Sequence, residues 1–332
     1  MEQSAAALEG VGMTLKHSRV LVTGATGFVG AHLVKQLVGQ GARVYSTSIS
    51  RNPLSYFFEQ KLDRQSTVLQ VDLCDFEKVK DIVSKFEIEY IFHLAAQPIV
   101  SVAYHNPRRT LESNVMGTVN ILEAARLYQP KGVIVASSDK AYGKHGQTQY
   151  TEDAPLQGDH PYEVSKSAAD LIAMTYAKTY GLPIVTSRFG NIYGPGDLNF
   201  SRIIPGIMES LVTNQTLELR SDGSMVRDYL HVEDVVRGYL LLAKKVNEFQ
   251  GEAFNFGSDE TLSVIETIHS IEKALKKKVK YAVLNNAKNE IPYQSLDYTK
   301  AKQKLGWTPQ ISINTSAKTI FKWYKQTLAS RL

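Results

Sequence analysis

The chain has 332 residues, of which 43% are hydrophobic and 21% charged, and its formal net charge is +5. This composition is typical of a soluble globular protein and excludes disordered and fibrous classes. The chain contains no run of about 18 apolar residues, so we expect no transmembrane helix and no membrane partner. Its densest basic run, residues 273–280, lacks the interleaved aromatic residues of a single-strand binder, so we expect no nucleic-acid partner.

Residues 1–16 lack the basic start and the apolar core of a secretory signal, and we expect them to form a loosely ordered extension. The only cysteine, Cys74, excludes an internal disulfide. A reducing cytoplasm is therefore the expected location of the protein.

Short runs rich in Val and Ile predict strands that are buried on both faces, because the apolar residues do not alternate with polar ones. These predicted strands are 19–24, 43–47, 67–73, 90–95, 132–137 and 184–188. Amphipathic stretches between them predict helices at 28–40, 76–86, 107–128 and 162–180. Strand and helix in alternation imply an α/β fold with a doubly wound parallel Rossmann sheet.

After Gly190 the apolar spacing becomes irregular, and Gly194-Pro195-Gly196 marks a loop. We expect residues 17–188 to form a dinucleotide-binding Rossmann domain. Residues 189–332 are expected to form mainly a smaller C-terminal substrate lobe, with a return to the large sheet near 235–256. Such a lobe would cover the carboxyl edge of the sheet, where ligands bind in open α/β folds.

The sequence G-A-T-G-F-V-G begins at Gly24, directly after the first predicted strand. Gly24 would allow a tight turn, Gly27 the close approach of a pyrophosphate, and Gly30 the packing of the next helix on the sheet. That helix begins with Phe28 and Val29, and its free N–H groups would point at the phosphates. The motif therefore predicts a dinucleotide cofactor.

Other residues at strand ends are candidates for the rest of this cofactor. They are Asp72 and Leu73 after the third strand, Leu94, Ala95 and Ala96 after the fourth, and Ser113. Asp72 is placed to meet the adenine amine, although a carboxylate at the end of a strand also serves in turns. The second strand leads to Ser48, where NAD enzymes usually carry an acid for the ribose hydroxyl. Because Ser48 is neutral and Arg51 follows, these residues leave NAD and NADP open.

Tyr162 and Lys166 lie four residues apart and so share one face of the fourth predicted helix. An ammonium beside a phenol favours the phenolate, and we expect the pKa of Tyr162 to lie below the ordinary value of about 10. The phenolate would accept the proton of an alcohol while hydride leaves the same carbon. Ser138, at the end of an upstream strand, would share the substrate hydroxyl.

These motifs make the chain similar to the extended short-chain dehydrogenase/reductases that act on nucleotide sugars. The shared motifs run in order from T-G-A-T-G-F-V-G through H-L-A-A, S-S-D-K-A-Y-G, Y-E-V-S-K and R-F-G-N-I-Y-G-P-G-D to L-G-W-T-P. A-A-Q-P-I-V, N-V-M-G-T, S-S-D-K and G-D-L-N-F-S-R-I-I-P most resemble CDP-glucose 4,6-dehydratases. R-D-Y-L-H-V-E-D is closer to dTDP-glucose dehydratases and UDP-glucuronate decarboxylases, so the nucleotide base stays open.

The resemblance implies NAD as the cofactor and a nucleotide-diphosphate-hexose 4,6-dehydratase, with CDP-glucose favoured. Tyr162 would take the C4 hydroxyl proton, and protonated Asp139 would give a proton to the departing C6 hydroxyl. Lys140 stands where many 4,6-dehydratases have Glu, and it would act as the C5 base or stabilise the enolate.

Two other functions stay open at this point. A 4-epimerase or a UDP-glucuronate decarboxylase would share Tyr162, Lys166 and Ser138, but an epimerase has no use for an acid at Asp139. A non-catalytic NAD(P)-sensing module is disfavoured, because such modules usually lose the tyrosine or the lysine.

The resemblance also suggests where a nucleotide-diphosphate sugar and a second subunit would bind. Arg202 and Arg227 are candidates for the diphosphate, because guanidinium forks fit phosphate oxygens. Asn191 would hydrogen-bond the sugar or phosphate and Gln97 would touch the sugar; surface ion pairing or loop capping is the alternative for these residues. Proteins of this kind commonly form homodimers through the helices 107–128 and 162–180, which would pack as a four-helix interface. No metal site is expected, since His93 has no companion ligands.

Overall fold

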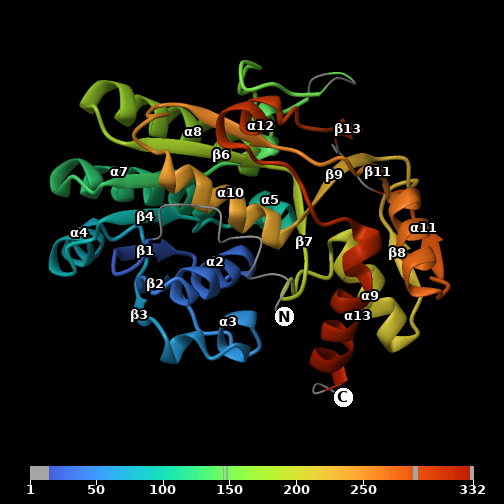
Figure 1. The fold of residues 1–332 in the computed structure, drawn as a ribbon. Helices are drawn as coiled ribbons and strands as arrows, with labels where there is room; N and C mark the ends of the chain where they lie inside the picture. Colours follow the sequence, from blue (N-terminus) through green and yellow to red (C-terminus); the bar gives the residue numbers. More distant parts are fainter. Residues whose placement is uncertain (1–14, 145, 147–148, 287–290, 330–332) are drawn as a thin grey trace.

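The computed structural model of the chain describes residues 15–144, 146, 149–286 and 291–329. Most of the predicted extension 1–16 therefore lies outside the described residues, and Leu15 at its end is buried. A large sheet with flanking helices forms one part of the molecule, and a smaller lobe around α9, α11 and α13 forms the other (Figure 1). Among the described residues, no helix is long and apolar enough to cross a membrane.

The large sheet has seven strands in the order β10-β6-β5-β4-β1-β2-β3, and all of its pairings are parallel. The strands are β1 (Arg19–Thr23), β2 (Arg43–Ser48), β3 (Thr67–Gln70), β4 (Tyr90–His93), β5 (Gly132–Ala136), β6 (Ile184–Phe189) and β10 (Ala253–Phe256). The order reverses between β1 and β4, which creates the crevice of a doubly wound fold. The predicted α/β class with a parallel Rossmann sheet is confirmed.

Helices cover both faces of this sheet. They are α2 (Phe28–Gly39) and α10 (Val232–Lys244) on one face, and α4 (Phe76–Lys85), α7 (Gly117–Tyr128) and α8 (Pro161–Tyr180) on the other. In β1, Val20 and Val22 pack into the cluster shared with α2 and α10, whereas Leu21 packs into the cluster shared with α4, α7 and α8. Because both faces are covered, the strands are apolar without alternation.

The predicted helix 107–128 is not continuous. It consists of α6 (Pro107–Leu111), a π-helical turn (Glu112–Met116) and α7. The turn brings the buried side chain of Asn114 to two neighbours, since its Oδ1 accepts from Gln97 N at 2.7 Å and its Nδ2 donates to Ser165 Oγ at 2.9 Å. These contacts tie the π-helical turn to the loop after β4 and to helix α8.

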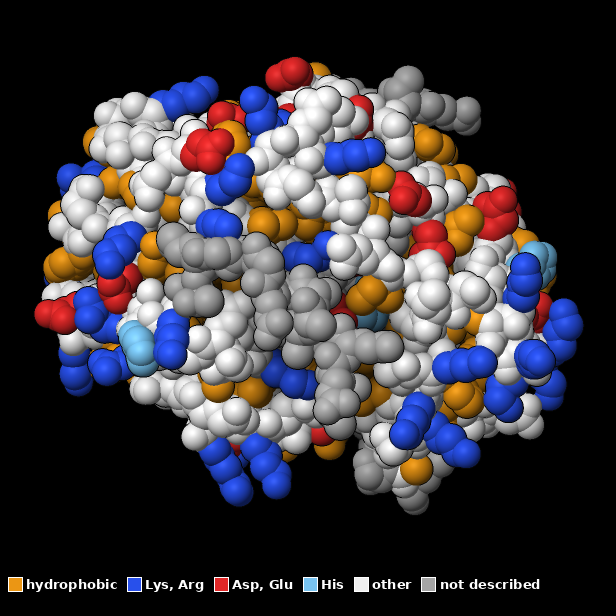
Figure 2. All heavy atoms as spheres, viewed as in Figure 1, with side chains coloured by type: hydrophobic (Ala, Val, Ile, Leu, Met, Phe, Trp, Pro, Cys, Tyr) orange, Lys and Arg blue, Asp and Glu red, His pale blue; other side chains and the backbone are white. Residues whose placement is uncertain are grey.

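The second lobe holds two small sheets and three helices among the described residues. One sheet contains β7 (Asn191–Tyr193), β9 (Val226–His231), β11 (Thr261–Ser263) and β13 (Tyr293–Gln294); the other pairs β8 (Leu217–Leu219) with β12 (Tyr281–Val283). The helices are α9 (Ile203–Thr213), α11 (Val264–Leu275) and α13 (Ile313–Ala329), whereas α12 (Thr299–Leu305) packs against β10 of the large sheet. Lys and Arg side chains gather over α11 and the neighbouring helices on the face shown in Figure 2. The lobe joins the large sheet through β6–β7 and β10, so its sheet stands beside the carboxyl ends of those strands.

Candidate active site

The glycine-rich turn between β1 and α2 is tightly folded. Gly24 has a φ of +68°, and a Cβ there would lie 2.9 Å from the Cα of Ala95. A Cβ at Gly30 would collide with the carbonyl oxygen of Gly24, so only glycine lets α2 approach this closely. The N–H of Gly27 donates to the same carbonyl oxygen at 3.0 Å.

The N-terminus of α2 lies open at this turn. Gly27 is the N-cap, and no described side chain caps the helix or places a negative charge in its first turn. The backbone N–H groups of Phe28 and Val29 therefore have no partner within the helix. Open amides at the positive end of a helix dipole suit phosphate oxygens, so the turn fits the pyrophosphate of a dinucleotide.

Asp72 lies beyond the third strand, which ends at Gln70 and is shorter than the predicted 67–73. Its carboxylate accepts from Cys74 N at 3.0 Å and from Arg109 Nη2 at 2.7 Å. Burial raises the pKa of Asp72, but the hydrogen bonds from Cys74 and Arg109 lower it by more, so that it lies below its usual value. Asp72 is therefore an ionised turn carboxylate that is already paired with an arginine.

Ser48 closes β2 at the position expected for the ribose. Its hydroxyl accepts from Thr26 Oγ1 at 3.2 Å and donates to the carbonyl oxygen of Ser50. The guanidinium of Arg51 lies over the ring of Phe58, 4.9 Å from its centroid. Arg51 thus lies against an aromatic ring, and no hydrogen bond within the described part of the chain links it to the Ser48 hydroxyl.

A cavity of about 1240 Å³ runs from the carboxyl edge of the large sheet into the second lobe. The predicted residues that line it are Val29, Leu94, Ala96, Ser138, Asp139, Lys140, Tyr162, Lys166, Asn191, Arg202 and Arg227. The predicted residues outside this lining are Gly24, Gly27, Phe28, Gly30, Ser48, Asp72, Leu73, Ala95, Gln97 and Ser113. The structure therefore gathers the candidate catalytic and diphosphate-binding residues in one cavity.

Helix α8 carries Tyr162 and Lys166 into this cavity. It begins with Pro161 in its first turn and ends where Gly181 takes the left-handed conformation, with a φ of +65°. Tyr162 and Lys166 are 8% and 7% exposed. The ammonium of Lys166 donates to the carbonyl oxygen of Ala136 at 2.9 Å.

The expected low pKa of the Tyr162 phenol is wrong for this structure. Burial raises the pKa of Tyr162 to about 12, although the Arg202 guanidinium and a hydrogen bond with Ser138 act in the opposite direction. Burial also lowers the pKa of Lys166 to about 8, and the charge of Asp170 partly offsets this change. The reason is desolvation, which disfavours both the phenolate of Tyr162 and the ammonium of Lys166. The four-residue spacing of the two side chains does not compensate for this loss of hydration.

The 3-10 turn η3 (Asp139–Tyr142) follows β5 and faces α8. Ser138 caps it by accepting from Lys140 N at 3.2 Å, and its hydroxyl donates to Asp139 Oδ1 at 2.9 Å. Asp139 is only 4% exposed, and its charge acts on the phenol of Tyr162. Ser138, Asp139 and Tyr162 therefore meet around one point of the cavity wall.

Lys140 points toward the second lobe. Its ammonium donates to Oε1 of Gln294, a buried residue of β13. Lys140 also acts electrostatically on Glu163. The contact with Gln294 joins positions 154 residues apart, which no local pattern in the sequence indicates.

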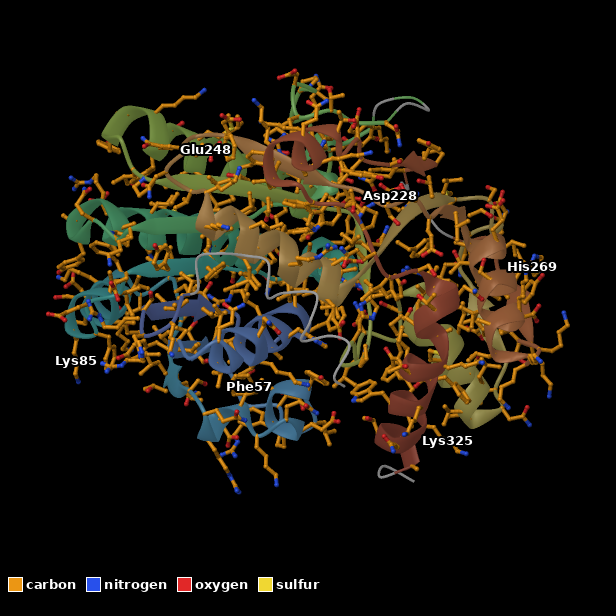
Figure 3. All side chains as sticks on the ribbon, viewed as in Figure 1. Phe57, Lys85, Asp228, Glu248, His269 and Lys325 are labelled. Atoms are coloured by element: carbon orange, nitrogen blue, oxygen red, sulfur yellow. The ribbon has the colours of Figure 1, made fainter. Side chains whose placement is uncertain are left out.

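Arg227 lies on β9 beside Asp228, which Figure 3 labels at the junction of the two lobes. The carboxylate of Asp228 accepts from Thr261 Oγ1 at 2.6 Å and from Leu296 N at 2.7 Å. Burial raises the pKa of Asp228 to about 6. These bonds fix β9 and thereby the backbone that carries Arg227 into the cavity.

The remaining predicted substrate residues are held in different ways. Arg202 precedes α9 and pairs with Asp197 at 3.2 Å, while about two-fifths of its side chain stays exposed. Asn191 Nδ2 is buried and has no hydrogen-bond partner among the described residues. Gln97 donates to Thr110 Oγ1 at 3.1 Å and so packs against α6 instead of lining the cavity.

The cavity also contains residues that the sequence analysis did not single out. Glu163 is 2% exposed and pairs with His160 at 3.2 Å, and both flank Tyr162 in the sequence. Despite burial, hydrogen bonds from His160 and from the backbone of Asp159 keep the pKa of Glu163 below its usual value. The far end of the cavity is lined by polar residues in and next to α9 and β8, namely Glu209, Gln215, Glu218 and Arg220. The position of Glu163 and His160 next to Tyr162 in the sequence could have identified these two residues. No local pattern in the sequence marks the residues at the far end of the cavity.

Comparison with known proteins adds to this geometry. Residues 21–320 match the family model described as GDP-mannose 4,6 dehydratase. A CDP-glucose 4,6-dehydratase of Salmonella typhimurium is 32% identical over 327 residues, which cover 92% of this chain and 90% of that protein. A UDP-glucuronate 4-epimerase of Thermodesulfobacterium geofontis is 29% identical, covering 93% of this chain and 96% of that protein.

Solved structures share the same architecture. The UDP-glucose 4-epimerase of Thermotoga maritima with UDP-glucose superposes with a TM-score of 0.85 at 30% identity, covering 93% of this chain and 99% of that one. A dTDP-glucose 4,6-dehydratase of Streptomyces venezuelae with NAD bound superposes with a TM-score of 0.85 at 27% identity, covering 94% and 98%.

Proposed function

Because the chain belongs to the GDP-mannose 4,6 dehydratase family, we propose that it is an NAD-dependent nucleotide-diphosphate-hexose 4,6-dehydratase, with CDP-glucose as the favoured substrate. The reaction oxidises C4, removes water across C5 and C6, and adds hydride at C6 and a proton at C5 of the resulting double bond, giving a 4-keto-6-deoxy sugar. The observation that carries this proposal is the buried carboxyl of Asp139, which meets Ser138 and Tyr162 at the cavity wall.

The cofactor would be held by the turn at Gly24, Gly27 and Gly30 and by the open first turn of α2. The collision that a Cβ at Gly30 would cause supports a cradle of this kind. NAD, when bound, supplies the acceptor for the C4 hydride and the donor of that hydride to C6. The stacking of Arg51 on Phe58 favours NAD over NADP, since a 2′-phosphate needs a cation directed at it.

Tyr162 would remove the proton of the C4 hydroxyl through its phenolic oxygen. Because burial raises the pKa of this phenol to about 12, its neighbours must favour the phenolate during reaction. The Ser138 hydroxyl and the Arg202 guanidinium act in that direction, and Lys166 adds a positive charge on the same helix face. A base positioned in this way typically contributes about 10²- to 10⁴-fold to the rate.

Asp139 and Lys140 would carry the loss of water. Once C4 is a ketone, the C5 proton becomes acidic, and Lys140 would accept it or stabilise the enolate charge. Asp139, in its protonated form, would give a proton to the departing C6 hydroxyl, which leaves as water. Asp139 and Lys140 are consecutive residues of η3, and both line the same cavity. This arrangement supports a separate role for each residue at one bound sugar.

The rest of the cavity suits the nucleotide diphosphate. Arg202 and Arg227 would bind the diphosphate, and the unpartnered amide of Asn191 would donate to the sugar or phosphate. The base would lie between α9 and β8, where Glu209, Glu218 and Arg220 line the far end. The Salmonella relative supports cytosine as this base.

The proposed homodimer would use the outer faces of the helices 107–128 and 162–180. These faces carry large exposed apolar side chains, namely Leu111, Met116, Leu127, Tyr128, Val164, Leu171 and Tyr180. Since α7 and α8 pack side by side, two copies would bury these residues as a four-helix interface.

A 4-epimerase is the second candidate, because relatives at 29% and 30% identity carry that name. Both functions would use Tyr162, Lys166 and Ser138. An epimerase returns hydride to C4 and loses no water, so Asp139 would have no proton to deliver.

The test is a panel of CDP-, dTDP-, UDP- and GDP-hexoses with the purified protein and NAD, without any external reductant. We expect the CDP-glucose reaction to give a product lighter by one water. A product of unchanged mass with inverted C4 would establish the epimerase instead. No turnover of any nucleotide sugar would overturn the proposed function.

A further inference from the structure

A buried ion pair joins α8, the helix that carries Tyr162 and Lys166, to strand β6. Asp170 on α8 accepts from Arg188 Nε at 2.8 Å and from Arg188 Nη2 at 3.0 Å. The two side chains are 0% and 3% exposed. A buried ion pair is a weak source of stability, because desolvation offsets most of its attraction. The two parallel hydrogen bonds of this pair fix the relative orientation of the carboxylate and the guanidinium. The groups next to Asp170 and next to Arg188 indicate which parts of the site the pair orients.

One end of the pair acts on Lys166. Asp170 follows Lys166 by four residues and so lies one turn along the same face of α8. Burial of Lys166 lowers the pKa of its ammonium, and the negative charge of Asp170 raises it. Other charged and titratable groups also lie around this part of the cavity. They are Tyr162 and Glu163 on α8 with His160 before it, Arg202 before α9, Asp139 and Lys140 on η3, His93 on β4 and Tyr239 on α10.

The other end of the pair holds η3. Arg188 Nη1 donates to the phenolic oxygen of Tyr142 at 2.7 Å and to the carbonyl oxygen of Glu152 at 3.1 Å. The Tyr142 hydroxyl in turn donates to Asn255 Oδ1 at 2.7 Å. Tyr142 is the last residue of η3, whose first residue is Asp139. A single guanidinium on β6 therefore links α8 to the turn that carries the candidate acid.

We propose that the Asp170–Arg188 pair is a positioning device of the active site. Asp170 keeps the Lys166 ammonium charged on the face of α8 that also carries Tyr162, and Arg188 holds η3, with Asp139 and Lys140, against α8. The part concerning Asp139 rests on the proposed function, whereas the part concerning Lys166 is a property of the protein alone.

Loss of the Asp170 charge should lower the pKa of Lys166. Burial lowers the pKa of Lys166 to about 8 even with Asp170 present. Removal of the nearby negative charge would lower it further, since an opposite charge favours the ammonium. The fraction of charged lysine at neutral pH would then fall, and the phenolate of Tyr162 would lose its positive neighbour.

The first test measures Lys166 directly, without substrate or cofactor. Acetic anhydride labels the neutral amine only, so peptide mass spectrometry of Lys166 across pH gives the midpoint of its titration. We expect the midpoint in Asp170→Asn to lie about one pH unit below that of the wild type. Equal midpoints in the two folded proteins would overturn the role of Asp170.

Two further variants separate this role from loss of structure. Asp234→Asn removes an equally buried carboxylate from an arginine, but its bonds go to Gln310 and Ile311, so the Lys166 midpoint should not move. The double variant Asp170→Asn/Arg188→Gln removes the charge without leaving a buried guanidinium unpaired, and it should shift the midpoint in the same direction. An unshifted midpoint there would contradict the proposal.

The second test concerns η3 and uses Tyr142→Phe, which removes one hydroxyl and leaves the ion pair intact. We expect dehydration of the nucleotide sugar to slow about tenfold at unchanged KM, with the Lys166 midpoint as in the wild type. Unchanged dehydration in this variant would overturn the role of Arg188. If the wild type itself turns over no nucleotide sugar, the proposed function fails, and the labelling experiment still decides the role of Asp170.

Discussion

The hydroxyl of Ser138 donates to the carboxylate of Asp139 at 2.9 Å, and the same side chain acts to lower the pKa of the Tyr162 phenol. Ser138 thus stands between the group that would take the C4 proton and the group that would protonate the leaving C6 hydroxyl. Both groups are nearly inaccessible to bulk water, with exposures of 8% and 4%. A site of this kind can handle two protons of one bound sugar, one at the C4 hydroxyl and one at the C6 hydroxyl.

Replacing Asp139 by Asn should separate oxidation from dehydration. The amide keeps the shape of the carboxyl but has no proton to give to the leaving hydroxyl. We expect water loss to fall about 10²- to 10⁴-fold, while partial reduction of bound NAD by the sugar persists. Nicotinamide absorbance and product mass report the two steps. Asp159→Asn, at an exposed carboxylate paired with Lys144, is the matched control, and wild-type dehydration in Asp139→Asn would remove Asp139 from the acid role.

Replacing Tyr162 by Phe should abolish the first chemical step. The phenyl ring preserves packing in α8, but no oxygen remains to take the C4 proton. We expect reduction of bound NAD by the sugar to fall at least about 10²-fold in single-turnover absorbance measurements. The exposed Tyr281→Phe serves as the control for loss of a hydroxyl elsewhere. Oxidation at the wild-type rate in Tyr162→Phe would contradict the assignment.

Replacing Gly30 by Ala should disturb the cofactor turn. The added Cβ would collide with the Gly24 carbonyl oxygen, so α2 must move away from the turn. We expect a loss of about 1–3 kcal/mol of stability together with loss of copurifying NAD, measured by thermal unfolding and by nucleotide content. Gly39→Ala in the same helix meets nothing within 4 Å and should be neutral or stabilising. Full NAD occupancy in Gly30→Ala would contradict the proposed pyrophosphate site.

Stability should fall as the solution becomes acidic, in part because of His32. Burial lowers the pKa of His32 to about 4, so the folded protein resists a proton that the unfolded chain accepts near pH 6.5. Its contribution is therefore present above pH 6.5 and is lost as the pH falls toward 4, by about 2 kcal/mol at pH 5. Denaturant unfolding at pH 8 and pH 5 should show a smaller difference in His32→Gln than in the wild type.

The matched control for this titration is His269→Gln. His269 lies exposed on the outer side of α11, where Figure 3 labels it, so this substitution changes a histidine that folding does not bury. An identical pH dependence in His32→Gln and the wild type would contradict the account of His32.

The proposed dimer face can be tested on α8. Val164 and Leu171 are 42% and 52% exposed and lie two turns apart on this helix. We expect Leu171→Glu to give a monomer in light scattering at micromolar concentration, because a charge would be buried at the centre of the apolar interface. Leu54→Glu, at an equally exposed leucine outside these helices, should leave the assembly unchanged. A dimer that persists in Leu171→Glu would place the interface elsewhere.

The parts of this site that follow from local sequence were predictable. The glycine turn at Gly24 and the spacing of Tyr162 and Lys166 depend on a few consecutive residues, and their place in the strand-helix alternation indicated the fold. The π-helical turn was not predictable, because no local pattern marks it and the bonds of Asn114 within it join residues distant in the sequence, Gln97 and Ser165. The pKa of Tyr162 was mispredicted, since burial is a property of the whole fold and raises the pKa by more than Arg202 and Ser138 lower it.

The most direct test of the central claim follows the hydrogen on C4. CDP-glucose carrying deuterium at C4 should give a 4-keto-6-deoxy product that carries the deuterium at C6, with loss of one water and no added reductant. NMR and mass spectrometry locate the label. Deuterium recovered at C4 of an inverted sugar, or substrate recovered unchanged, would contradict the proposed dehydratase.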